Sequence, residues 1–182
     1  DTIVVSAHHE QSNSREINGD QTNNGAPFAG AVYVFLRNGS TWSQQAYLKA
    51  SNAEGGDYLG YSLAIDGDTV VAGAVSESSN ATGVNGNQED NSSFAAGAAY
   101  VFVRNGATWT QQAYLKGTGS YGAQFGAGVA VNGNTVAVGS MSNGDVDIFV
   151  RNQNTWAFQT RIGGSGYYRL VSLSLLGDRL LF

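Results

Sequence analysis

The chain has 182 residues, with 25 Gly, one Pro and no Cys, and only 13% of its residues are charged. Without cysteine it has no disulfide scaffold, thiol nucleophile or cysteine zinc site, and its 42% hydrophobic content argues against disorder. A net charge of −5 with scattered Lys and Arg is not that of a nucleic-acid binder, and no apolar run approaches the ~20 residues of a membrane helix.

Strand patterns follow one another along the chain, and no segment has a helical period. A strand at 1–7, a polar loop and two further strands form the first unit. The next unit is complete, with Asp66-Gly67 and Asn105-Gly106 as hairpin turns. Its four strands are predicted at 59–65, 69–74, 98–104 and 109–116. A third unit over 125–156 repeats this order with a shorter loop, and a final hairpin pattern spans 170–182.

Internal repetition is the main signal in the sequence. The nine residues 41–49 recur 67 residues later at 108–116, with Ser43 replaced by Thr110 as the only change. The segment 31–39 recurs at the same offset, and a weaker third copy follows the second by 47 residues. Four-stranded units that repeat in this way are typical of propeller blades, which bury their faces by stacking on their neighbours.

The sequence therefore predicts an all-β fold, a β-propeller made of four-stranded antiparallel blades. About three blades are present, as a partial propeller or as one part of an oligomeric one. Small residues such as Gly60 and Gly126 crowd the first two strands of each unit, as a narrow inner channel requires. Bulky residues lie on the outer pair, where we expect them to fill the wedge between blades: Tyr33, Phe35, Trp42, Tyr47 and Leu48.

The segment 59–74 resembles the FG-GAP repeat of integrin α-chain propellers, in its bacterial form. The segment 125–140 resembles it too, with the Phe-Gly pair intact. This resemblance implies a propeller that is used for adhesion and ligand binding. The chain lacks the Asp-x-Asp-x-Asp-Gly calcium loop of several integrin blades, so integrin-type calcium binding is not carried over.

Blade units are predicted at about 1–58, 59–124 and 125–167, with the start of a further blade at 168–182. Three blades are too few to close a ring, and the pattern starts and stops within a blade. We therefore expect either further blades or self-association of chains through their open blade faces.

Two polar loops align at the 67-residue offset and carry oxygen ligands of the kind that Ca²⁺ prefers. The candidate calcium ligands are Glu10, Asn18, Asp20 and Asn24 in the first loop and Glu77, Asn87, Glu89 and Asp90 in the second. The alternative is that Asn, Asp and Gly only form turns that bond to their own backbone. The replacement of Asp20 by Asn87 between the copies favours this alternative.

Other polar and aromatic residues have simpler interpretations. Asp145-Val146-Asp147 is expected to form a solvated hairpin, and His8-His9 to point in opposite directions without forming a metal site. The repeated Trp42, Trp109 and Trp156 suit either sugar binding or packing between blades, and packing is favoured. In the pairs Gln44-Gln45 and Gln111-Gln112, alternation predicts one solvent-facing side chain each.

The leading hypothesis is a non-catalytic extracellular module, secreted or at the cell surface, that recognises a protein or a glycan through its propeller loops. It includes calcium as a candidate stabilising ion. The alternative is an assembly protein whose incomplete propellers pack into oligomers or filaments. A third hypothesis is a hydrolase domain within a longer propeller protein, although no catalytic residues are evident in the sequence.

Overall fold

The computed structural model describes residues 1–117, 120–163, 172–177 and 179–181. All the regular secondary structure within these residues is β-strand. The four strands predicted for the complete unit are all present, with bounds within a residue of those expected. No helix long and apolar enough to cross a membrane occurs in this part of the chain.

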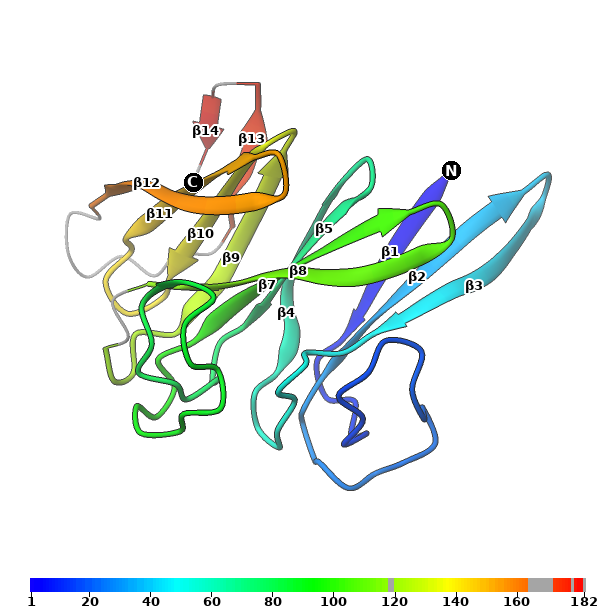
Figure 1. Cartoon of the computed structure of the whole chain (residues 1–182), viewed down its shortest axis with the longest axis horizontal. Coiled ribbons are helices and arrows are strands. Elements are labelled where there is room, and N and C mark those ends of the chain that lie inside the picture. Colours follow the sequence, from blue (N-terminus) through cyan, green and yellow to red (C-terminus); the bar gives the residue numbers. More distant parts are fainter. Residues whose placement is uncertain (118–119, 164–171, 178, 182) are drawn as a thin grey trace.

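The strands form three antiparallel blades and a short hairpin, shown side by side in Figure 1. Blade 1 consists of β1 (Thr2–Ala7), β2 (Ala31–Asn38) and β3 (Thr41–Leu48). Blade 2 consists of β4 (Leu59–Asp66), β5 (Thr69–Ala74), β7 (Ala98–Asn105) and β8 (Thr108–Lys116), with the short β6 (Gly83–Val84) paired along β8. Blade 3 consists of β9 (Phe125–Asn132), β10 (Thr135–Ser140), β11 (Val146–Asn152) and β12 (Thr155–Ile162). The hairpin is β13 (Ser174–Leu176) and β14 (Arg179–Leu181).

This is the partial β-propeller that the repeats predict, with one difference. The two-residue strand β6 lies within the second polar loop and was not predicted, because two residues carry no period. Of the predicted further blade, residues 172–177 and 179–181 form the hairpin, whereas 168–171, 178 and 182 lie outside the described residues. Residues 164–167 of the third unit also lie outside them.

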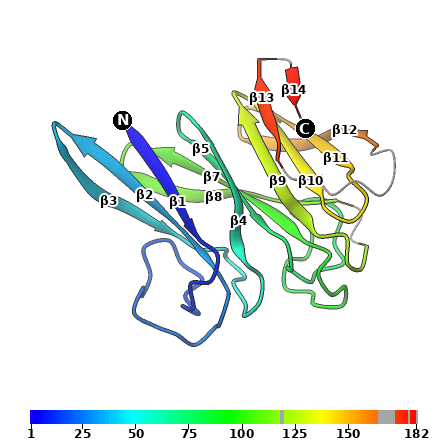
Figure 2. The same cartoon turned by 180° about the vertical axis from the view of Figure 1, so that it is seen from behind.

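The innermost strands succeed one another across the molecule, as the view from behind shows (Figure 2). They approach closely because glycine lines them. Gly126 has a φ of +88°, and a Cβ added at Gly73 would overlap the carbonyl oxygen of Gly126. The neighbouring Phe125 is buried between blades 2 and 3. The Phe-Gly pair therefore has two structural roles. The Phe125 ring fills the core between blades 2 and 3, and Gly126 allows the backbones of the two blades to approach closely.

Apolar side chains fill the space between successive blades. The first core lies between blades 1 and 2 and contains Val32, Val34 and Leu48 from blade 1, packed with Val70 and Tyr100 from blade 2. An equivalent core joins blades 2 and 3. A smaller cluster places the hairpin residues Leu173, Leu175 and Leu180 against blade 3. Blade 2 thus uses one face for blade 1 and the other for blade 3, and blade 3 uses one face for blade 2 and the other for the hairpin.

A polar contact, here called the clasp, repeats at both junctions. The indole Nε1 of Trp109 in blade 2 donates to Gln45 Oε1 in blade 1 at 3.0 Å, and Arg104 Nη1 donates to the same oxygen at 3.2 Å. At the next junction, Trp156 Nε1 donates to Gln112 Oε1 at 2.7 Å, and Arg151 Nη1 donates at 3.4 Å. Each arginine also reaches the first threonine of the second strand in the preceding blade, Thr2 or Thr69.

A β-bulge aims each glutamine of the clasp. In blade 1, Val34 pairs with Ala46 and Phe35 with Gln44, so Gln45 has no residue opposite it. Gln112 is left over in the same way in blade 2. A bulge redirects the extra side chain away from strict alternation. The prediction that one glutamine of each pair faces solvent is therefore wrong for the second pair, where Gln112 binds Trp156 and Gln111 accepts from the backbone N–H of Ser51 at 3.0 Å.

The tryptophans confirm packing between blades at two positions of three. Trp109 and Trp156 are each 3% exposed, but Trp42 in blade 1 is 40% exposed. No described residue lies in front of blade 1 in the way that blade 1 lies in front of blade 2.

Candidate functional site

The long loops 8–30 and 75–97 project from one end of the molecule, together with the connection 49–58 (Figure 1). We call these segments and residues 120–124 the loop end. The candidate calcium ligands all lie in its two long loops. The hairpins Asp66–Thr69, Asn38–Thr41 and Asn105–Thr108 lie at the opposite end of the strands.

A buried lysine holds the first loop from inside. Lys49 follows β3, and its Nζ donates to Glu10 Oε2 at 3.0 Å and to the backbone oxygens of Ser12 and Gly30 at 2.8 Å each. The lysine side chain is fully buried, and Glu10 is almost so. The ammonium group thus ties both ends of the loop to the strand that follows it.

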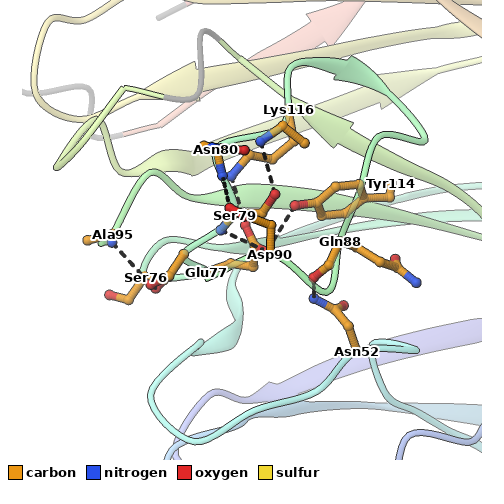
Figure 3. Close-up of polar contacts among 12 residues, drawn as sticks. Asn52, Ser76, Glu77, Ser79, Asn80, Gln88, Asp90, Ala95, Tyr114 and Lys116 are labelled. Carbon is orange, nitrogen blue, oxygen red and sulfur yellow. Dashed lines mark hydrogen bonds and ion pairs between the residues drawn. The ribbon is translucent and has the colours of Figure 1, made fainter. Parts of the chain in front are cut away.

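The same arrangement recurs in blade 2, where Figure 3 shows it. Lys116 Nζ donates to Glu77 Oε2 at 2.8 Å, and Tyr114 Oη donates to Glu77 Oε1 at 2.9 Å. The carboxylate and ammonium groups are each 1% exposed. A buried carboxylate needs such partners, because an uncompensated charge in the interior is strongly unfavourable.

Burial is the largest cause of the pKa shifts of the ionisable side chains in this interior. Burial lowers the pKa of Lys49 and Lys116, while their carboxylate partners oppose the shift. Burial likewise raises the pKa of the Tyr114 hydroxyl, with the negative charge of Glu77 as the next cause. Asp57, which accepts from the backbone N–H of Glu54, has its pKa raised to about 7, chiefly by burial.

One predicted calcium ligand, Asn18, caps an outer strand instead, and its copy Asn85, which was not a candidate, does the same. Asn18 and its copy Asn85 have φ values of 60° and 55°, the left-handed region that asparagine tolerates. Asn18 Oδ1 accepts from the backbone N–H of Tyr47 at 2.9 Å, and Asn85 Oδ1 accepts from that of Tyr114 at 2.9 Å. Each asparagine therefore continues the sheet edge with its side chain.

The two predicted aspartates form turns with their own neighbourhood. Asp20 Oδ1 accepts from the backbone N–H and the hydroxyl of Thr22 at 2.8 and 2.7 Å. Asp90 Oδ1 accepts from the backbone of Asn80 at 2.9 Å and from Ser92. These bonds lower the pKa of both carboxyls: the Thr22 hydroxyl is the largest cause for Asp20, and the Asn80 backbone N–H for Asp90.

The remaining three candidates are Asn24, Asn87 and Glu89, and each has different surroundings. Asn24 is exposed, and the preceding Asn23 accepts from the backbone N–H groups of Asn13 and Gly25. Asn87 Oδ1 accepts from the backbone of Glu89 at 3.2 Å. The Glu89 carboxylate pairs with Arg15 at 3.0 Å on the surface.

The contacts favour the self-bonded turns over a calcium cage. Within residues 1–117, 120–163, 172–177 and 179–181, no three His, Asp or Glu side chains group in a way that would hold a metal ion. Positive charge is nevertheless supplied inside each loop, by Lys49 and Lys116, which bind carboxylate and backbone oxygens as a cation would. Calcium binding stays a prediction, with these lysines as the competing account.

Exposed aromatic rings are the feature of the loop end that sequence reasoning missed. Phe28 and Tyr58 stack at 5.6 Å between ring centroids, and Phe94 and Tyr121 lie 5.6 Å apart at the next junction. Phe94 is 62% exposed and Tyr121 75% exposed. Phe28 and Tyr58 also have φ values near +60°, which are rare for bulky residues. Strained residues of this kind cluster at functional sites.

The histidines join this surface, contrary to expectation. His8 and His9 lie in the turn beyond β1, so alternation does not apply, and their ring centroids are 4.3 Å apart. His9 also packs edge-on against Phe28, at 5.1 Å. On the inner side, His8 and Tyr61 line a hollow of about 480 Å³.

Blade 3 departs from the pattern, and one expectation about it is wrong. Asp147 is 2% exposed instead of solvated, because it accepts from Arg161 Nε and Nη2 at 2.5 and 2.7 Å. Asp147 and Arg161 stand at the positions of Tyr100 and Tyr114. Gly163 stands at the position of Lys116. Where the lysine is missing, the loop between the second and third strands is only residues 141–145.

The comparison with protein families agrees with this architecture. Residues 42–102, from β3 to β7, match the family model described as FG-GAP repeat. This segment is an FG-GAP repeat. It runs from the outermost strand of blade 1, β3, through the loop end and the inner strands β4 and β5, into the third strand of blade 2, β7. A search of curated proteins finds no match to the chain. FG-GAP repeats are found in extracellular, integrin-like propellers.

The buried ion pair of blade 2 should control stability. Replacing Lys116 by Met leaves Glu77 buried without its partner, which should lower the free energy of unfolding by about 3–5 kcal/mol. The double variant Lys116→Met with Glu77→Gln should lose clearly less. Arg15→Met, which removes exposed pairs, should cost at most about 1 kcal/mol. Urea denaturation measures all three, and a Lys116→Met loss no larger than that of Arg15→Met would contradict this role.

Calcium should have little effect if lysine supplies the positive charge. We expect the same Tm in calcium and in a chelator, whereas an ion present at 100 times its Kd would add about 2.7 kcal/mol of stability. Differential scanning calorimetry with magnesium as the control decides this. A calcium-specific rise in Tm that Asp20→Asn and Glu89→Gln abolish would instead support the calcium hypothesis.

Proposed function

We propose that this chain is a non-catalytic extracellular module that binds a protein or a glycan through its loop end. The observation that carries the proposal is the exposure of paired aromatic rings there. Single exposed apolar side chains are common on monomeric proteins, whereas exposed rings that adjoin one another form the kind of contiguous apolar patch that marks an interaction site. Tyrosine and phenylalanine also bring large contact area at low cost in side-chain entropy.

The construction of the loops supports binding. Phe28 and Phe94 stand on the loops that Lys49 and Lys116 hold, and loops on a rigid scaffold are common binding elements. Side-chain bonds also connect one loop to the next. Arg15 pairs with Glu54 and Glu89, and Asn52 Nδ2 donates to the backbone oxygen of Gln88 at 2.8 Å. The loop end is therefore one connected surface across two blades.

The hydrolase alternative finds less support in the same contacts. Glycoside hydrolysis uses a pair of carboxyl groups that are free to reach the substrate. Glu10 and Glu77, the repeated carboxylates, are occupied by lysines and withdrawn from the surface. The extracellular location is part of the proposal, and it is supported by the typically extracellular location of FG-GAP repeats.

The binding proposal is tested by removing rings from the loop end. The chain is presented to a glycan array and to a panel of extracellular matrix proteins, and any ligand found is titrated. The double variant Phe94→Ser with Tyr121→Ser should raise the Kd at least about 30-fold, the size of a hot-spot loss.

Trp42→Ser is the matched control, because Trp42 is an exposed ring on β3, next to the hairpin Asn38–Thr41 at the end of the strands opposite the loop end. Its Kd should remain that of the parent chain. Equal binding by all three proteins would contradict the proposal, and so would the absence of any ligand on either panel.

A further inference from the structure

Blade 2 has both faces covered by described blades, yet its outer edge is only partly paired. Its strands run in the order β4-β5-β7-β8-β6, and β6 pairs with β8 at two positions, Gly83 with Lys116 and Val84 with Leu115. Among the described residues, no strand pairs with the outer edge of Thr108–Ala113. Blades stack through their faces, so this edge lies on the rim, where a neighbouring blade does not cover it.

Asn85 ends the contact between β6 and β8. Its backbone N–H donates to the Tyr114 carbonyl oxygen at 2.8 Å, and its Oδ1 accepts from the Tyr114 backbone N–H at 2.9 Å. With a φ of 55°, Asn85 then turns the loop away from the strand. In continuation of β6, a hollow of about 440 Å³ lies between residues 85–88 and residues 111–114 of β8. We call it the amide hollow.

Five amide side chains line the amide hollow, and the oxygen of each accepts a hydrogen bond from this chain. They are Asn85, Asn87, Gln88, Gln111 and Gln112. The amino groups of Asn85, Asn87 and Gln112 make no hydrogen bond to another described residue. No charged side chain lines the hollow. It therefore offers neutral donors and suits a ligand that brings uncharged acceptors, such as the carbonyl oxygens of a peptide.

The two remaining glutamines form a wall that is fixed before any ligand arrives. Gln111 Nε2 donates to Gln88 Oε1 at 3.4 Å, and Gln88 Nε2 donates to Ser51 Oγ at 2.8 Å. The backbone N–H of Ser51 donates to Gln111 Oε1 at 3.0 Å. Asn52 Nδ2 holds the backbone oxygen of Gln88 from the same connection (Figure 3). A wall that is already ordered reduces the entropy lost on binding.

Beyond the hollow, β8 presents a regular strand edge. Thr108–Gln111 pairs residue by residue with Phe102–Asn105 of β7, and the bulge comes only at Gln112. The segment 108–113 contains no charged residue and no proline, two of the features with which proteins protect an edge from pairing. An edge of this kind is a template for an added strand.

We propose that the outer edge of β8 binds an extended, uncharged peptide segment of a partner protein, which adds to blade 2 as a strand antiparallel to β8. The amino groups of Asn85, Asn87 and Gln112 donate to carbonyl oxygens at the start of the segment, and Thr108–Gln111 forms a ladder with the rest. A glycan would satisfy the donors but would not match the alternating backbone groups of a strand. The exposed rings of the loop end take no part, so this inference goes beyond the proposed function and does not depend on it.

The test presents the whole chain to a phage-displayed library of random linear peptides. Selected peptides are synthesised, titrated by calorimetry and then methylated at one backbone nitrogen at a time. In a strand, alternate N–H groups point to the same neighbour. Methylation should therefore raise the Kd at least about 10-fold at every second position of the paired segment, and much less at the positions between.

Asn87→Asp removes one donor from the hollow and keeps the acceptor that Glu89 uses. Blade 1 carries Asp20 at the copy position, where its Oδ1 accepts from the backbone N–H of Thr22, so the fold accepts this residue. The variant should keep the Tm of the parent chain and raise the Kd of the selected peptides about 10-fold. Asn154→Asp makes the same change on an exposed turn before β12 and is the matched control, with the Kd of the parent chain.

Three results would overturn the proposal. They are the selection of no peptide, methylation effects without alternation, and a parent-like Kd for Asn87→Asp. The double variant Phe94→Ser with Tyr121→Ser separates the two sites. Peptides whose Kd rises in this double variant and not in Asn87→Asp would belong to the rings of the loop end, which would support the proposed function and contradict strand addition at β8.

Discussion

The structure depends on the contact between one blade and the next. A blade is a single sheet with two apolar faces, and neither face is buried until another blade covers it. The apolar cores between blades supply the area, but area alone does not set register. Register comes from the clasp, in which a bulged glutamine accepts from a tryptophan and an arginine of the following blade. A bulge slipped by one residue would point the glutamine elsewhere and leave a buried indole N–H without an acceptor.

The same dependence explains the loop end. A long polar loop between the second and third strands has little apolar surface of its own to bury. In blades 1 and 2 a lysine at the end of the fourth strand reaches back into the loop and neutralises its buried glutamate. In blade 3 this position is Gly163, the loop is short, and an Asp–Arg pair fills the space of two tyrosines. The long loop and the lysine therefore occur together. The buried lysine–glutamate pair holds the long loops that form the surface of the loop end.

Much of this architecture was predictable from the sequence, because the same strand and turn pattern occurs in more than one copy and each copy supports the assignment of the others. The 67-residue offset located the strands and hairpins, and the Phe-Gly pairs indicated the family. The offset also aligned Glu10 with Glu77, but it did not show which groups these glutamates bind. Lys49 and Lys116 were visible in the repeat as strand residues, and only the fold brings each one back to a glutamate 39 positions earlier.

Other features have no local signature. Whether a bulge falls at Gln45 or at Gln112 is decided by the pairing of two strands, so alternation alone was wrong for the pair Gln111-Gln112. The exposed rings of the loop end were missed because the sequence does not tell whether an aromatic residue in a loop is buried or exposed to solvent. Their exposure depends on how two blades place neighbouring loops, and on left-handed backbone at Phe28 and Tyr58.

An indole N–H enters each of the two described blade junctions and finds its acceptor there. The chain has three tryptophans, so its indole N–H groups give three resolvable NMR signals. Hydrogen exchange should be slow for Trp109 and Trp156 at every protein concentration. For Trp42, which is 40% exposed, it should be fast. Equal exchange rates for all three indoles in dilute solution would contradict the account.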